Sequence, residues 1–365
     1  MEEMPPAGSE EGLVQQAQEE ESQSRPTPER LPLLLSQKPV FRVLDPPDPG
    51  DLVYHPHRKI FPANSREAYT LDYGWNIICA SRRGDSHAHH GKYREDDFSV
   101  RYICADPQSH MARGVLVALA DGVSSSAYSR RGARAAALGA TEDIPEEMLT
   151  RLIHAVRQGQ TLDVFVTSIF AQMRETARQA VVKQAEQDQL SLSDLYSTLL
   201  AFLAIPTGYE SLVLASAQIG DGALYAFRAQ EYEGERPRDL WRVLQKQQIQ
   251  ENGNEVQPFM YSSANAWIQS LQYSPHLQTT FIMAMTDGTA DDLQPAFPTH
   301  DTPDPDPCFF VHQFYKEIAR QTFSRAGAAQ ALEEFLQYEQ AQSRDDRTVV
   351  CLFTDYPHTS GIHLL

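Results

Sequence analysis

The sequence has few cysteines, few basic residues and no long apolar run. No stretch approaches the roughly 18 consecutive apolar residues of a membrane helix, so we expect no membrane association. Acidic residues (49) outnumber Lys and Arg (31), and the net charge of −18 argues against a nucleic-acid-binding surface. The four cysteines form no Cys-x-x-Cys pair, which excludes the usual zinc and redox motifs and suggests reduced thiols; they are Cys79, Cys104, Cys308 and Cys351.

The N-terminal region has few aromatic residues and no long apolar segment. The first six residues, Met-Glu-Glu-Met-Pro-Pro, contain no apolar segment of the kind found in signal peptides. Together with the reduced thiols, this predicts a cytoplasmic protein. Residues 1–55 are rich in Glu, Gln, Ser and Pro, and we expect a disordered acidic tail because such a segment buries too little apolar surface to offset the entropy of ordering.

The rest of the chain has the pattern of a globular domain. Short apolar runs predict strands at 75–81, 98–104, 115–120, 198–205, 211–219, 223–227, 240–244, 281–285 and 348–353. Helical spacing predicts helices at 127–141, 146–157, 161–189, 309–322 and 328–341. The polar segment 245–275 is expected to be a surface insertion. Two strand-rich blocks separated by long helices indicate sheets packed face to face, with helices outside.

Three of the predicted strands end on Asp-Gly, at Asp121, Asp221 and Asp287, and Asp345-Asp346 directly precedes the last strand. Asp-Gly is also a favoured hairpin turn, so one such ending alone indicates only a turn. Asp121, however, is followed by a small-residue loop and a helix rather than by a strand. Carboxylates that converge at strand ends repel each other unless cations lie between them, so the pattern favours a divalent-metal centre.

Six motifs in this order resemble those of the metal-dependent serine/threonine protein phosphatases of type 2C, closest to their bacterial branch. They are Gly84-Asp85-Ser86-His87 with Arg94-Glu95-Asp96-Asp97-Phe98, then Ala120-Asp121-Gly122-Val123, Tyr196-Ser197-Thr198-Leu199-Leu200, Ile219-Gly220-Asp221-Gly222, Thr286-Asp287-Gly288-Thr289-Ala290-Asp291 and Asp345-Asp346-Arg347-Thr348. The resemblance covers residues 75–353 and implies a phosphatase domain at 66–356. It also implies an α+β fold: two antiparallel β-sheets packed face to face as a central sandwich, flanked by helices on both sides in four αββα layers.

The resemblance implies hydrolysis of phosphoserine and phosphothreonine in proteins, by attack of a water that bridges two Mg²⁺ or Mn²⁺ ions. Paired hard cations lower the pKa of such a water and clamp the phosphoryl oxygens, and they prefer carboxylate ligands. In the implied roles, Asp121 bridges the metals, Asp287 and Asp345 complete one shell, and Glu95, Asp96 and the Gly122 carbonyl serve the other. Asp121, Asp287 and Asp345 are thus the implied catalytic set, and Asp221 and Asp291 match positions of a third, weaker metal site.

The sequence also departs from the family pattern. The family often has a phosphate-gripping arginine four residues before the Glu, where this chain has Gly91. Nearby side chains could replace this arginine and bind the substrate phosphate, namely His87, His89, His90, Lys92 and Arg94. The alternative is that they form a solvated loop with no role. Val123 occupies the position of a histidine general acid found in some members, Gly222 replaces a serine and Asp346 replaces an asparagine.

Two other functions remain open at this stage. The first is a catalytically weak phosphatase-fold module that acts as a regulatory binding protein, which the missing arginine favours and the retained aspartates disfavour. The second is a phosphohydrolase of small molecules, because the metal chemistry is the same. For the leading hypothesis we expect a phosphorylated protein substrate and a cognate Ser/Thr kinase as partners, with no nucleic acid and no membrane.

Overall fold

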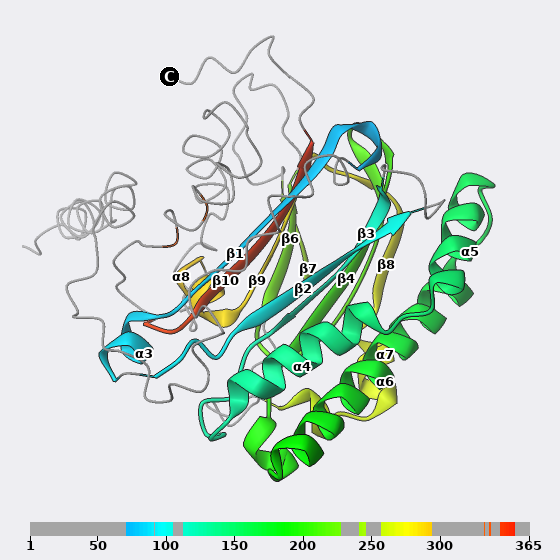
Figure 1. The fold of residues 1–365 in the computed structure, drawn as a ribbon. Coiled ribbons are helices and arrows are strands. Elements are labelled where there is room, and N and C mark those ends of the chain that lie inside the picture. Colours follow the sequence, from blue (N-terminus) through cyan, green and yellow to red (C-terminus); the bar gives the residue numbers. More distant parts are fainter. Residues whose placement is uncertain are drawn as a thin grey trace, which may run out of the picture.

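Two antiparallel sheets packed face to face form the centre of the protein (Figure 1). The computed structural model describes residues 71–90, 92–104, 112–227, 241–245, 257–293, 332, 336 and 344–354. One five-stranded sheet has the order β1 (Trp75–Arg82), β10 (Arg347–Thr354), β9 (Phe281–Met285), β6 (Ala223–Phe227) and β7 (Trp241–Gln245). The other has the order β2 (Asp97–Cys104), β3 (Ala112–Ala120), β4 (Leu199–Gly208), β5 (Ser211–Ile219) and β8 (Gln272–Gln278).

Strand β3 shows why the sequence forms a layered core. Successive side chains of a strand point to opposite faces of the sheet. Val115 and Val117 are buried between the two sheets, whereas Leu116 and Ala118 are buried in a second cluster with the helices. An uninterrupted apolar run is therefore required, because this sheet is covered on both faces.

The described helices are placed mostly on one side of the sandwich. Helices α4 (Ser129–Glu142), α5 (Glu146–Arg157), α6 (Asp163–Asp188) and α7 (Ala264–Gln269) cover the outer face of the β2–β8 sheet (Figure 1). A third buried cluster lies on the outer face of the other sheet. It contains Ala290, which belongs to α8 (Asp287–Leu293), and also Leu332 and Leu336. Short elements complete the described chain: η2 (Asp72–Gly74), α3 (Asp85–His89), η3 (Leu192–Leu195) and η5 (Phe259–Tyr261).

The predicted α+β sandwich of two antiparallel sheets with helices is confirmed. The predicted surface insertion at 245–275 needs correction, because its described part is built into the fold. Trp267 of α7 is fully buried and its Nε1 donates to the Phe170 carbonyl at 2.8 Å. Strand β8 then begins at Gln272 and pairs with β5. Most of its side chains are exposed, so the sequence has no continuous apolar run there.

Several predictions fall outside the part of the chain that the structure describes. These are the acidic tail at 1–55 and, apart from Leu332 and Leu336, the helices at 309–322 and 328–341. Among the described helices, none is both long enough and apolar enough to cross a membrane.

Candidate metal centre

The acidic strand ends meet at one edge of the sandwich, as the pairing of the strands requires. Asp97, which begins β2, pairs with Ala120, the last residue of β3. In the other sheet, Met285 at the end of β9 pairs with both Ala223 at the start of β6 and Val349 near the start of β10. Residues that precede β2, β6 and β10 therefore lie beside residues that follow β3 and β9.

Asp121, Asp221 and Asp287 converge at this edge. Their ligand oxygens lie within 4.8 Å of one another. Burial raises the pKa of Asp121 and of Asp287 well above the ordinary range, and the charges of neighbouring aspartates, Asp345 among them, raise both further. Burial also raises the pKa of Asp221 to about 6, and the charge of Asp291 adds to this.

Asp96 is a fourth carboxylate of this centre. Its Oδ2 accepts hydrogen bonds from Thr286 Oγ1 at 2.7 Å and from Thr348 Oγ1 at 2.8 Å. Burial is the main reason that the pKa of Asp96 rises to about 7. The two threonines fix one oxygen of the carboxylate and leave the other for a different contact.

The donor set fits a divalent cation. Oδ1 of Asp96, Oδ1 of Asp221 and Oδ1 of Asp287 are buried and have no hydrogen-bond partner. A buried carboxylate oxygen without a donor is unfavourable, and several together are more so because like charges repel. Carboxylate oxygens are the ligands that Mg²⁺ and Mn²⁺ prefer, so a bound cation would relieve both penalties.

Backbone and side-chain contacts hold Asp121 in place. Its N–H donates to Thr198 Oγ1 at 3.0 Å, and its carbonyl accepts from the Thr198 N–H at 2.8 Å. The neighbouring Gly122 pairs with Ser197 in an isolated antiparallel bridge. A Cβ at Gly122 would lie 2.7 Å from Ser129 Cβ and 3.0 Å from Glu95 Cβ, so glycine is needed here for close approach.

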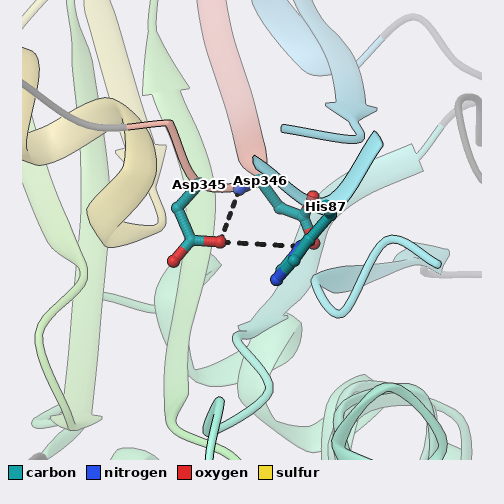
Figure 2. Close-up of side chains that lie close together, drawn as sticks. All are labelled: His87, Asp345 and Asp346. Atoms are coloured by element: carbon teal, nitrogen blue, oxygen red, sulfur yellow. Dashed lines mark hydrogen bonds and ion pairs between the residues drawn. The ribbon is translucent and has the colours of Figure 1, made fainter. Parts of the chain in front are cut away.

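A second cluster contains His87, Asp345 and Asp346 (Figure 2). His87 Nδ1 lies 3.0 Å from Asp346 Oδ2 and 3.7 Å from Asp345 Oδ1, and Nε2 lies 3.7 Å from Glu95 Oε2. Burial lowers the pKa of His87, but the hydrogen bond to Asp346 and the three carboxylate charges together raise it to about 9. The imidazole is thus a cation placed among acidic groups.

Asp346 connects three segments of the chain. Its Oδ1 accepts from the Gly84 N–H at 2.6 Å, and its Oδ2 accepts from the Glu95 N–H as well as facing His87. Although burial acts in the opposite direction, these partners lower the pKa of Asp346 below its ordinary value. The side chain is 1% exposed, so it acts as a buried tie between the start of β10, the α3 turn and the segment before β2.

A pocket of about 450 Å³ opens beside these clusters. Its lining residues are Ser86, His87, His90, Lys92, Ser124, Asp291, Arg344 and Asp345. The sequence had given candidate roles to His87, His90, Lys92, Asp291 and Asp345 among them, and had given none to Ser86, Ser124 or Arg344.

Three other predicted site residues have different surroundings. Glu95 is part of the second cluster, and burial is the main cause that raises its pKa to about 7. His89 is exposed and its ring lies 5.2 Å from that of His90. Arg94 is 1% exposed, its Nη2 lies 4.0 Å from Asp97 Oδ1, and it does not line the pocket. We therefore leave Arg94 out of the proposed phosphate site.

Mn²⁺ should raise the melting temperature of the protein, and Asp287→Asn should abolish this rise. A cation that binds only the folded state adds about 2.7 kcal/mol of stability at a concentration of about 100 times its dissociation constant. Without metal, Asp287→Asn should itself be more stable than the wild type, because a buried carboxyl with a raised pKa destabilises the fold at neutral pH. Differential scanning fluorimetry with Mn²⁺ and with EDTA measures both effects.

The matched control is Asp143→Asn, which changes an exposed aspartate after α4. It should keep the wild-type response to Mn²⁺. A rise of the same size in Asp287→Asn would contradict the assignment of Asp287 as a ligand.

Comparison with known proteins shows the family and the fold of this chain. A profile of the family described as Protein phosphatase 2C matches residues 83–337. Among solved structures, serine-threonine phosphatase 2C from Toxoplasma gondii is 13% identical, with a TM-score of 0.50 over 81% of this chain and 98% of that one. A serine/threonine phosphatase from Mycobacterium tuberculosis is 16% identical, with a TM-score of 0.35 over 77% and 99%.

No curated protein matches the chain. The family profile spans well over half of the sequence, and the Toxoplasma gondii structure supports the same fold. The chain therefore belongs to the protein phosphatase 2C family.

Proposed function

We propose that this protein is an Mg²⁺- or Mn²⁺-dependent phosphatase that hydrolyses phosphoserine and phosphothreonine in proteins. The observation that carries the proposal is the group of buried carboxylate oxygens without donors, contributed by Asp96, Asp221 and Asp287 around Asp121. Such a group has no evident structural use at the end of a sandwich, because it destabilises the fold without a cation. It is the composition expected of a metal-dependent hydrolase.

The ligand assignment follows the motifs. Asp121 would be shared by two cations, with Asp287 and Asp345 on one side and Glu95, Asp96 and the Gly122 carbonyl on the other. Asp221 and Asp291 would serve a third, weaker site. Bound divalent cations supply a water of lowered pKa and neutralise charge on the phosphoryl oxygens.

The chain's own residues prepare the site for this chemistry. Thr198 fixes the backbone of Asp121, and Thr286 and Thr348 fix one oxygen of Asp96. These contacts hold the carboxylates before substrate arrives, and such preorganisation is what a hydrolytic site requires. The pocket beside Asp345 is open to solvent on the side of Lys92 and Arg344, which are both exposed, and this suits a phosphate on a large protein substrate.

Wild-type protein should hydrolyse an aryl phosphate and a phosphothreonine peptide with Mn²⁺ present, and EDTA should abolish both activities. Re-addition of Mn²⁺ should restore them. Hydrolysis that persists in EDTA would contradict the proposal. Binding of Mn²⁺ without turnover of either ester would instead favour the regulatory binding protein. Turnover of the aryl phosphate with no turnover of any phosphopeptide would favour a small-molecule phosphohydrolase.

A further inference from the structure

Two cationic side chains border the pocket from different parts of the sequence. Lys92 follows the α3 turn, and Arg344 directly precedes the proposed ligand Asp345. Both side chains are exposed, and both line the same pocket as Asp345. The lining of the pocket thus combines two cationic side chains with the carboxylates of Asp291 and Asp345.

The backbones of both residues are fixed to the same short helix. The Lys92 N–H donates to the His87 carbonyl at 2.8 Å, and the Lys92 carbonyl accepts from Arg83 Nη1 at 3.0 Å. The Arg344 carbonyl accepts from the Ser86 N–H at 3.0 Å. The backbones of the two residues are therefore held relative to each other, although they are about 250 residues apart in sequence.

Close packing reinforces this arrangement at Gly84. A Cβ there would lie 2.5 Å from the Arg344 carbonyl oxygen and 2.3 Å from the Asp345 carbonyl carbon. Only glycine permits this approach of the two backbones. Main-chain contacts consequently fix the backbone of Arg344 beside Asp345, while the Arg344 side chain is exposed.

The charge of the site makes such cations necessary. A phosphate monoester is a dianion, and the centre it must approach is lined by aspartates. The Nδ1 of His87 is turned toward Asp346 at 3.0 Å, and Arg94 lies in the interior. Among the described residues that line the pocket, Arg344 is the arginine and Lys92 is the lysine, and both side chains are exposed to incoming substrate. A guanidinium binds two phosphate oxygens at once, and an ammonium binds as a point charge.

We propose that Arg344 and Lys92 together bind the phosphoryl group of the substrate, in place of the arginine that this chain lacks at Gly91. The inference rests on the proposed function and extends it, because it assigns phosphate recognition to the residue before the Asp345-Asp346 pair. Arg344 is the main contact and Lys92 the second. They act on the phosphoryl group rather than on the polypeptide that carries it.

The test compares Arg344→Ala and Lys92→Ala with matched controls at exposed positions of the outer helices. Arg157→Ala in α5 and Lys183→Ala in α6 remove the same charges far from the pocket. Arg344→Ala should raise KM for the aryl phosphate and for the phosphothreonine peptide by about tenfold, which corresponds to the loss of one charge-assisted contact. The inhibition constant of inorganic phosphate should rise by the same factor, Lys92→Ala should show a smaller rise, and both controls should match the wild type.

Three readouts make the result decisive. The melting-temperature rise with Mn²⁺ should be unchanged in Arg344→Ala, which shows that the metal centre is intact. Arg344→Lys should recover part of the lost affinity for inorganic phosphate. If the inhibition constant of phosphate stays at the wild-type value in both pocket variants, or if the controls lose as much affinity, the proposal is wrong. A rise in KM for the peptide alone would also overturn it, because the contact would then be with the polypeptide.

The test also separates this inference from the proposed function. If the wild type hydrolyses neither ester, the proposed function fails. Calorimetric titration of the Mn²⁺-loaded protein with inorganic phosphate still decides whether Arg344 and Lys92 bind phosphate. Binding that is weakened in the variants supports the pair, and equal binding or none in all proteins overturns it.

Discussion

Asp121→Asn should lower the turnover of a phosphothreonine peptide at saturating Mn²⁺ by more than about 100-fold, a loss of about 2.7 kcal/mol of transition-state stabilisation. In the proposed ligand set, Asp121 is the carboxylate shared by the two cations. Its pKa is raised first by burial and then by the charges of Asp287, Asp96, Asp345 and Asp221. Asparagine has the same shape but lacks the negative charge that is proposed to bind the cations, so the transition state is stabilised less. The measurement is kcat with the peptide, with the aryl phosphate as a second substrate.

The variant should remain folded, so that the loss can be assigned to chemistry. The contacts that hold Asp121 involve its backbone N–H and carbonyl with Thr198, and Asn keeps both. Removing a charge from a crowded acidic cluster should leave the metal-free protein at least as stable as the wild type. Asp143→Asn is the control for an aspartate outside the centre. Equal rates in wild type and Asp121→Asn would show that this strand end is only a turn.

The fold was predictable from the sequence wherever the periodic signal was strong. Helix α5 spans Glu146–Arg157, as the spacing predicted, and the end of β3 at Ala120 agrees with the apolar run that stops there. Strand β8 was not predicted, because most of its side chains are exposed. It lies at the edge of its sheet in the described part of the chain, where it pairs with β5. Helix α3 has only five residues, too few to show a helical period.

Some features of the candidate site were likewise predictable from the sequence, and others were not. The aspartates at strand ends were predictable, because antiparallel pairing brings such ends to one edge. The contacts of Thr286 and Thr348 with Asp96 were not, since they join segments 190 and 252 residues apart. Arg94 was expected at the phosphate and lies in the interior. Composition and spacing carry no information on which side of a loop a long side chain is buried.

Asp346 has contacts in the structure that the sequence did not reveal. In the sequence it is a mild exchange for asparagine. In the structure it has three polar partners: the Gly84 N–H, the Glu95 N–H and the His87 ring. An asparagine offers one acceptor oxygen and no charge, so it could not serve a charged histidine in the same way. The Asp346 and His87 side chains are therefore best understood as one unit, which the sequence alone did not pair.

Asp346→Ala should lower the free energy of unfolding by about 3–5 kcal/mol, the usual result of removing one partner of a buried ion pair. The variant leaves the Gly84 and Glu95 N–H groups without an acceptor, and it leaves the His87 ring without its nearest carboxylate. Each buried donor without a partner costs about 1–3 kcal/mol, so the contacts account for the whole effect. Urea unfolding at pH 7 in EDTA measures it without a contribution from cations.

A double-mutant cycle distinguishes the ion pair from the two backbone contacts. Asp346→Asn keeps an acceptor and should be less harmful than Asp346→Ala. His87→Gln should be harmful in the wild-type background, because it leaves Asp346 charged and buried. The double variant should then be more stable than the sum of the two single losses predicts, by about 0.5–3 kcal/mol, since neither partner remains unpaired. Additive losses would show that His87 and Asp346 stabilise the fold independently, and that the charge of Asp346 serves only the backbone of the turn before β2.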